Sequence, residues 1–298
     1  MTRQDDQRPA VVVTGVSSGI GLAIAEDLLE RGHQVFGSVR KLADAQALTA
    51  RWGEQFVPLV FDVTDSTALP GVVAQVQTCL GGRGLRALVN NAGISLSGPL
   101  MHQPLSEVRQ VFEVNVFGLL AVSQAFLPLL GARKGAGQPP GRIVNIGSVS
   151  GAITVPFMGA YSGAKHAVEA FTQALRRELI PYGIQVSAVE PGFIRSNLFD
   201  KNAAHVQRSG YESTDYAPLW AQFNASLQAS EAKAKPASLV TQAVRHAIES
   251  PKPRTRYPLD AIWTLGRVLP DRMFDKLIFK ALGMDQLVQG KPFVQPTD

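Results

Sequence analysis

Three side chains in the segment from Arg142 to Lys165 could carry acid–base chemistry. Ser148 follows an apolar run typical of a buried strand, and Tyr161 and Lys165 lie further on, where the pattern is that of an amphipathic helix. Residues four apart share one face of a helix, so we expect Lys165 beside Tyr161. A free phenol has a pKa of about 10, and a cation about 4 Å away at an effective dielectric of about 20 contributes roughly 4 kcal/mol, or about three pKa units at most. Lys165 could therefore lower the pKa of Tyr161 until it acts as a general acid and base near neutral pH.

Ser148 completes this candidate set, since its hydroxyl could hold and polarise a substrate oxygen. The pair alone is weak evidence, because a tyrosine and a lysine at this spacing also arise by chance on helix surfaces. The rest of the chain must supply a reason for catalysis.

A glycine-rich loop near the start of the chain supplies one. The apolar run Ala10–Thr14 predicts a strand, and a helical pattern begins after Gly21. Strand, glycine turn and helix together are the context of a dinucleotide-binding loop, although glycines also make ordinary turns. Gly15 would permit the turn, Gly19 would let backbone amides approach a pyrophosphate, and Gly21 would let the helix pack closely. We expect the cofactor to bind at Gly15, Ser17, Ser18, Gly19, Ile20 and Gly21.

The second predicted strand, residues 33–39, indicates which cofactor is preferred. A carboxylate at its end would accept hydrogen bonds from the ribose of NAD, but Arg40 and Lys41 stand there instead. Two basic residues favour the 2′-phosphate of NADP(H), with NAD(H) still possible. The alternative is that both are solvated residues at the start of the next helix.

The next two strands end in polar residues as well. Residues 56–61 precede Asp62 and Val63, a predicted adenine site, although Asp62 could equally cap a helix that begins at Ser66 or Thr67. Residues 85–89 precede an Asn-Asn-Ala-Gly sequence, whose small residues would let backbone pass beside a flat cofactor. Asn90 could brace neighbouring loops there, and Ala92 and Gly93 would line the cofactor, although the sequence is also an ordinary turn signal.

A long helix is predicted over residues 105–130. Asn115 lies in its middle among apolar residues, and a buried asparagine in a helix needs a hydrogen-bonding reason. It could hold a water molecule in a proton path, or it could make a structural hydrogen bond.

The alternation of strands and helices predicts an α/β fold. Six alternations up to the strand at 184–189, with a short seventh strand at 254–257, give a Rossmann-type, doubly wound parallel sheet in a single domain over residues 1–298. Residues 10–195 would form the core, residues 196–230 a substrate lid, and residues 231–298 a helix, the short strand and a helical tail. The candidate residues follow strand ends, where this architecture places its ligand crevice.

These sequences together resemble the short-chain dehydrogenase/reductase family over residues 10–197. The similarity rests on the loop from Thr14 to Gly21, the sequence from Asn90 to Gly93, and Asn115. The Ser–Tyr–Lys set and the Pro-Gly dipeptide at 191–192 complete it. The sequences around Ser148 and Tyr161 look most like the retinol and hydroxysteroid dehydrogenase branch.

The resemblance implies roles for these residues. Tyr161 would be the acid/base, and Lys165 would bind the nicotinamide ribose and lower the tyrosine pKa. Ser148 would hold the substrate oxygen, and Asn115 would hold a relay water. Pro191, Gly192, Ile194 and Ser196 would border the nicotinamide, although the family more often has threonine at the place of Ser196. The resemblance also implies a homodimer or homotetramer formed through the helices that contain Leu105 and Tyr161.

The lid and the tail are rich in large apolar residues. Phe193 and Phe199 are predicted to contact substrate; Phe199, Tyr211, Tyr216, Trp220 and Phe223 could wall an apolar pocket, or could pack the lid onto the body. The tail over 259–282 could form a pocket wall, a dimer contact or an interfacial membrane helix, of which the first two are favoured.

The composition excludes several classes of function. A net charge of +5 without a lysine or arginine run argues against nucleic-acid binding. The single cysteine, Cys79, excludes an internal disulfide and a cysteine-rich metal site, and its helical surroundings predict a core or half-buried thiol. We expect no metal site, no signal peptide, no transmembrane span and a cytoplasmic location.

The sequence therefore predicts an NADP(H)-preferring oxidoreductase that interconverts an alcohol and its ketone or aldehyde. The substrate would be apolar and resemble a steroid, a retinoid or a lipid. A nucleotide-sugar epimerase shares the tyrosine–lysine pair but not the glycine spacing. The alternative outside enzymology is an NADP-binding regulatory protein without turnover.

Overall fold

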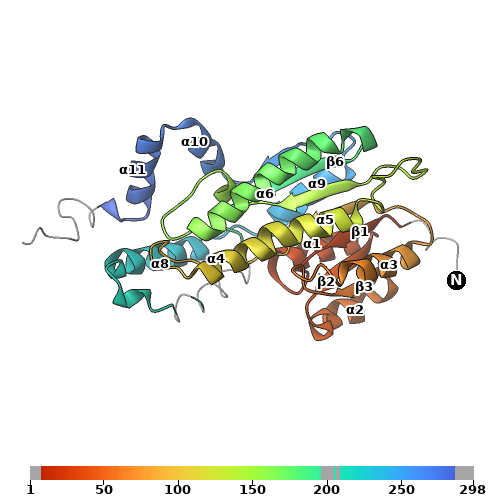
Figure 1. The fold of residues 1–298 in the computed structure, drawn as a ribbon, viewed down its shortest axis with the longest axis horizontal. Helices are drawn as coiled ribbons and strands as arrows, with labels where there is room; N and C mark the ends of the chain where they lie inside the picture. The colour runs from red at the N-terminus through yellow and green to blue at the C-terminus, as the bar shows by residue number, and fades with distance from the viewer. Residues whose placement is uncertain (1–7, 196–204, 206–208, 286–298) are drawn as a thin grey trace, which may run out of the picture.

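A seven-stranded sheet forms the centre of the computed structural model, which describes residues 8–195, 205 and 209–285 (Figure 1). All neighbouring strands are parallel, in the order β3-β2-β1-β4-β5-β6-β7. The predicted doubly wound sheet is confirmed. The strands are β1 (Ala10–Val13), β2 (Gln34–Val39), β3 (Phe56–Val60), β4 (Ala87–Asn90), β5 (Arg142–Ile146), β6 (Gln185–Glu190) and β7 (Arg256–Pro258).

The inner strands are apolar on both faces because helices cover both. In β1 every residue is buried, and Val12 is aligned with Phe36 of β2 and Leu88 of β4. Successive side chains of a strand point to opposite faces, so Val11 and Val13 belong to one core and Val12 to the other.

Two helical layers form those cores. On one face lie α1 (Gly19–Glu30), α2 (Gln46–Trp52) and α9 (Ser238–Glu249). On the other lie α3 (Leu69–Leu80), α5 (Leu119–Phe126) and α6 (Gly159–Glu178), and α4 (Leu105–Phe112) packs against α6. The crossovers place the loops that follow the strands at one edge of the sheet, as this architecture requires.

The predicted helix over 105–130 is not continuous. A π-helical turn, η4 (Glu113–Gly118), separates α4 from α5, and α5 ends at Phe126. Single π turns inside α-helices occur frequently at functional sites. Asn115 lies within this turn and is buried.

The C-terminal elements gather at the end of the molecule where α6 begins (Figure 1). They are α8 (Ala217–Ala232), α10 (Ile262–Val268) and α11 (Asp271–Ala281). Tyr211, Trp220 and Phe223 are buried in one cluster with Phe157, and Tyr216 packs against it. For these rings the packing alternative is therefore the observed one.

Cys79 corrects a prediction, because its thiol is exposed. The buried stripe of α3 consists of Leu69, Val72, Val76 and Leu80. Cys79 lies beyond the edge of this stripe, so the apolar pattern around it does not extend to its own side chain. Within the described residues, no helix is long and apolar enough to cross a membrane.

A buried polar network fixes the central strands to the helices. Nδ2 of Asn90 donates to Oγ of Ser123 at 2.8 Å and to Oδ1 of Asn145 at 2.9 Å. Nδ2 of Asn145 donates to Oγ1 of Thr172 at 2.8 Å. The network therefore joins β4 and β5 to α5 and α6. Asn90 was predicted to brace neighbouring loops, but its side chain connects strands and a helix inside the core.

We expect Asn145→Ala to lower the free energy of unfolding by about 1–3 kcal/mol, because it leaves buried hydrogen-bonding groups of Asn90 and Thr172 without their partner. Ser162→Ala is the matched control, since its buried hydroxyl has no hydrogen-bond partner among the described residues. Urea unfolding should show little loss, or a gain, for the control. Equal destabilisation by both variants would contradict the role of the network.

Candidate active site

Ser148 and Tyr161 meet beyond the end of β5. Ser148 begins the 3-10 turn η5 (Val149–Gly151), and its Oγ accepts the amide hydrogen of Ser150 at 3.0 Å. Tyr161 lies in the first turn of α6, and the Ser148 hydroxyl is close enough to the phenol to lower its pKa. The predicted proximity of these two groups is therefore observed.

Lys165 lies one turn further along α6, on the same face. Its Nζ donates to the carbonyl oxygen of Ile146 at 2.8 Å and lies 5.7 Å from the centroid of the Tyr161 ring. Only 6% of the residue is exposed, and this burial lowers the pKa of Lys165 to about 8. The last carbonyl of β5 thus holds a buried ammonium beside the tyrosine.

The pKa of Tyr161 departs from its predicted direction. Burial raises it, and the hydrogen bond with Ser148 lowers it by less. The expected lowering of this pKa by Lys165 is therefore not found in the protein alone, where the cost of placing a phenolate in the interior dominates. At neutral pH the phenol keeps its proton.

Asn115 makes structural hydrogen bonds. Its Oδ1 accepts from the amide of Ile94 and its Nδ2 donates to the Ile94 carbonyl, both at 2.8 Å. A Cβ on Gly93 would lie 3.1 Å from Oδ1 of Asn115, so a larger residue there would press on the Asn115 side chain. The structural alternative is observed for the side chain, and a relay water at this residue stays a prediction.

The glycine loop has the shape of a phosphate cradle. Gly15 and Gly19 have positive φ angles of 72° and 60°. A Cβ on Gly21 would lie 2.1 Å from the Gly15 carbonyl oxygen, so any larger residue would push the loop away from α1. Ser18 precedes α1, but its side chain makes no capping hydrogen bond. Ser17, Ser18 and Ile20 complete the turn, whose first amides point outward from the helix start.

The residues after β2 and β3 lie at the same edge of the sheet. Arg40 is exposed directly after β2. Oδ1 of Asp62 accepts from the amide of Thr64 at 3.0 Å and from its hydroxyl at 2.8 Å. The carboxylate therefore closes a local turn and does not cap α3, which begins later, at Leu69. Val63 is buried against Gly118 of the π turn.

Asn91, which the sequence did not single out, positions the glycine loop. Its Nδ2 donates to the carbonyl oxygens of Thr14 at 3.0 Å and Gly15 at 3.2 Å. Oγ1 of Thr14 accepts the amide hydrogens of Asn91 and Ala92. The segment with Ala92 and Gly93 is thereby fixed beside the loop. The sequence offered one signal for this residue, since Asn91 directly follows Asn90, which was an expected site residue.

The segment after β6 reaches back to the turn that carries Ser148. The amide of Val149 donates to the carbonyl of Pro191 at 2.9 Å, and a Cβ on Gly192 would lie 3.1 Å from a carboxylate oxygen of Asp260. Ile194 is buried, whereas Phe193 is 40% exposed. Ser196 and Phe199 lie outside the described residues.

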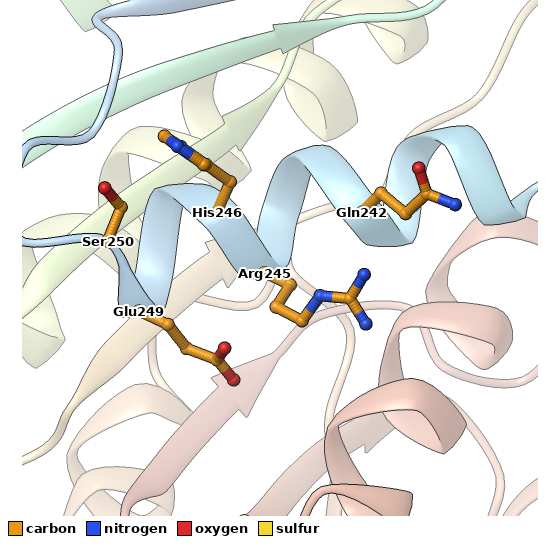
Figure 2. Close-up of a pocket in the computed structure, with 5 residues that line it drawn as sticks. All are labelled: Gln242, Arg245, His246, Glu249 and Ser250. Carbon is orange, nitrogen blue, oxygen red and sulfur yellow. The ribbon is translucent and has the colours of Figure 1, made fainter.

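A shallow depression on α9 does not belong to this site. It is lined by Gln242, Arg245, His246, Glu249 and Ser250 (Figure 2). Arg245 pairs with Asp27, Glu249 with His33, and His246 with Tyr257. These side chains already join α9 to its neighbours, so the depression is a packing seam.

Comparisons with known proteins agree with the geometry. A family model described as short chain dehydrogenase matches residues 9–207. An NADPH-dependent 3-dehydrocapnine reductase of Ornithobacterium rhinotracheale is 42% identical, over 91% of this chain and 96% of the relative. Retinol dehydrogenase 5 of Mus musculus is 32% identical, over 90% and 87%. The 17-beta-hydroxysteroid dehydrogenase type 6 of Bos taurus is 35% identical, over 83% and 79%.

A solved short-chain dehydrogenase from Streptomyces avermitilis superposes with a TM-score of 0.71 at 28% identity, covering 96% of this chain and 99% of its own. The chain therefore belongs to the short-chain dehydrogenase/reductase family and lies near its retinol and hydroxysteroid dehydrogenase branch.

Proposed function

We propose that this protein is an NADP(H)-dependent oxidoreductase that interconverts an alcohol and its ketone or aldehyde, with Tyr161 as the acid/base. The observation that carries the proposal is the Tyr161 phenol next to the Ser148 hydroxyl, with the buried ammonium of Lys165 5.7 Å from the centroid of its ring. It is a proton donor, a substrate-oxygen holder and a fixed cation in one place.

The residues present fit a dinucleotide, because Gly15 has a positive φ and packs against Ala92, and a Cβ at Gly21 would push the loop off α1, so the tight glycine turn at the start of α1 needs both glycines. When bound, NADP(H) would supply or accept the hydride. The loop Gly15–Gly21 would hold its pyrophosphate, Arg40 its 2′-phosphate, and Asp62 and Val63 its adenine. Asn90, Ala92 and Gly93 would lie beside the ring system, with Lys165 and Tyr161 at the ribose and Pro191, Gly192, Ile194 and Ser196 at the nicotinamide.

The pKa directions favour the reductive half of this chemistry at neutral pH. Because burial raises the pKa of Tyr161, its Oη carries a proton that can pass to the substrate oxygen. The Ser148 hydroxyl holds that oxygen, and the ammonium of Lys165 stabilises the tyrosinate that remains. Oxidation of an alcohol needs the deprotonated phenol and should therefore speed up as the pH rises.

The proposed substrate is apolar, as a steroid, a retinoid or a lipid-like carbonyl would be. Relatives named for retinol and a 17β-hydroxysteroid support this class. The exposed ring of Phe193, two residues after Pro191, gives one apolar contact near the catalytic set. Cytoplasmic location and a homodimer or homotetramer stay predictions.

Tyr161→Phe should lower kcat by about 100-fold or more, because the proton donor is lost while the ring remains. NADPH oxidation would be followed by absorbance over a panel of ketosteroids, retinal, aliphatic ketones and small aldehydes. NADPH binding, measured by fluorescence, should persist. Near-normal turnover in the variant would contradict the mechanism. Saturable NADPH binding by a wild type that turns over no member of a broadened panel would favour the regulatory alternative.

Arg40→Asp should move the preference toward NAD(H) by about ten-fold or more in the ratio of kcat/KM values, because a carboxylate repels the 2′-phosphate and accepts from ribose hydroxyls. Lys41→Asp is the matched neighbour. A shift in the Lys41 variant alone would assign the selection to Lys41, and no shift in either would exclude both.

Lys165→Met should stabilise the fold at pH 7 while reducing turnover. Folding lowers the pKa of Lys165 from 10.5 to about 8, because the buried side chain is harder to protonate than in the unfolded chain. The buried charge therefore lowers the free energy of unfolding by its full amount below pH 8, and this destabilisation disappears as the pH rises to about 10.5. We expect a gain of about 1–3 kcal/mol at pH 7, reduced by loss of the bond to Ile146, and a smaller gain at pH 9.5. Urea unfolding of Lys134→Met, an exposed lysine, provides the control. Destabilisation at pH 7 would refute the assigned cost.

A further inference from the structure

A cluster of charged side chains outside the catalytic set joins three elements. Glu169 of α6 and Glu190 at the end of β6 are buried, and Arg256 of β7 forms an ion pair with Glu169. Nη1 of Arg256 lies 3.9 Å from Oε1 of Glu190. Glu169 continues the face of α6 that carries Tyr161 and Lys165, at the same four-residue spacing. Glu190 directly precedes Pro191.

Glu190 also contacts the turn that carries Ser148. A Cβ on Gly147 would lie 3.4 Å from Cγ of Glu190. The amide of Gly147 donates to the carbonyl of Val189 at 2.7 Å. The cluster is therefore next to the backbone of three segments, namely the Ser148 turn, the catalytic face of α6 and the segment after β6.

Helix α10 covers this cluster with Trp263 and Arg267. Both guanidinium groups lie over the indole ring, Arg267 at 4.3 Å and Arg256 at 5.6 Å from its centroid. Nη2 of Arg267 lies 4.0 Å from Oε1 of Glu169. Cation–π contacts of this kind strengthen when they are shielded from water. The tail is thereby attached to α6 and β7 by two arginines and one ring.

The same helix touches the loop between Ser148 and Tyr161. A Cβ on Gly266 would lie 1.9 Å from Cγ2 of Ile153, so the backbone of α10 rests directly on this loop. On its other side Phe157, with a positive φ of 66°, is packed against Trp220 and Phe223. Such a backbone persists only where its surroundings hold it. The C-terminal helices α10 and α8 thus contact the loop between Ser148 and Tyr161 at two residues, Ile153 and Phe157.

Stability alone does not account for such a cluster. Burial and the neighbouring Glu169 raise the pKa of Glu190 to about 8, against the opposing effects of Arg256 and Trp263. Among the described residues, Oε2 of Glu190 and Nε1 of Trp263 lack a regular hydrogen bond. Buried charges with incomplete partners stabilise a fold less than apolar packing would.

We infer that α10 is a positioning element of the active site, which holds in register the segments of Ser148, of Tyr161 with Lys165, and of Pro191 with Gly192, through Trp263, Gly266 and Arg267. The inference rests on the proposed function, because these segments must act together only if a nicotinamide and a carbonyl meet between them.

The test compares Trp263→Ala with Trp263→Phe in the full chain. Hydrogen–deuterium exchange over residues 148–158 should accelerate by about ten-fold in the alanine variant, and the Kd for NADPH should rise by about five-fold. Phenylalanine keeps a ring under both arginines and should restore most of the protection and affinity. In the alanine variant we expect KM and kcat both to worsen, since binding and alignment depend on the same segments.

Arg272→Ala, a charge on the neighbouring α11, is the control and should change neither exchange nor affinity. If Trp263→Ala does not fold, Arg267→Ala replaces it, because that side chain is 39% exposed, and a smaller change in the same direction is expected. Wild-type exchange and affinity in the folded variants would overturn the inference. Exchange does not depend on turnover, so faster exchange together with an inactive wild type would contradict the proposed function and leave the positioning intact.

Discussion

A buried ammonium is the constraint on which the site depends. Lys165 is placed where water cannot solvate it, and the carbonyl of Ile146 is its hydrogen-bonded partner. The end of β5 and the first turns of α6 must therefore keep a fixed relation, or the charge loses that partner. Because Tyr161 shares the face of α6 with Lys165, the same relation places the phenol against Ser148. The rigid parallel sheet is what makes this arrangement possible, since β5 is held on both sides.

The loops around the site are fixed by contacts to backbone more than by contacts between side chains. Asn115 binds both polar groups of Ile94, Asn91 binds the carbonyls of Thr14 and Gly15, and Val149 donates to Pro191. Each contact joins the end of one strand to the end of another or to a helix. The edge of the sheet thus becomes one connected surface, and a dinucleotide lying across it would meet positions that are already set.

The sequence predicted the elements well because their signals are local. A β-branched run, a glycine turn and an amphipathic helix each depend on neighbouring residues, so the seven strands lie within one or two residues of their predicted ranges. The set of Ser148, Tyr161 and Lys165 was predictable because two of its members are one helical turn apart. The pKa of Tyr161 was not, because its direction depends on how deeply the ring is buried, which only the packed loops determine. Cys79 illustrates the same limit, since the apolar pattern of a helix does not determine whether a side chain at the border of the buried face is covered.

The Glu169–Glu190 cluster was invisible to the sequence for a different reason. Its members come from α6, β6, β7 and α10, and no spacing in the chain relates them. Taken with Lys165, it shows where the fold bears its costs. The pKa of Glu190 is about 8 in the folded chain and 4.5 in the unfolded chain, which therefore releases the proton at lower pH. For this reason the contribution of Glu190 to the free energy of unfolding falls as the pH rises from about 4.5 to 8. The destabilisation caused by the charge of Lys165 decreases only above pH 8, where the buried ammonium loses its proton. Both costs are therefore present together near neutral pH, one at the end of β6 and one on α6. A fold selected for stability alone would place apolar residues at both positions, so an unfavourable ionisable group on α6 and another at the end of β6, next to the turn that carries Ser148, favour a functional reason for this region.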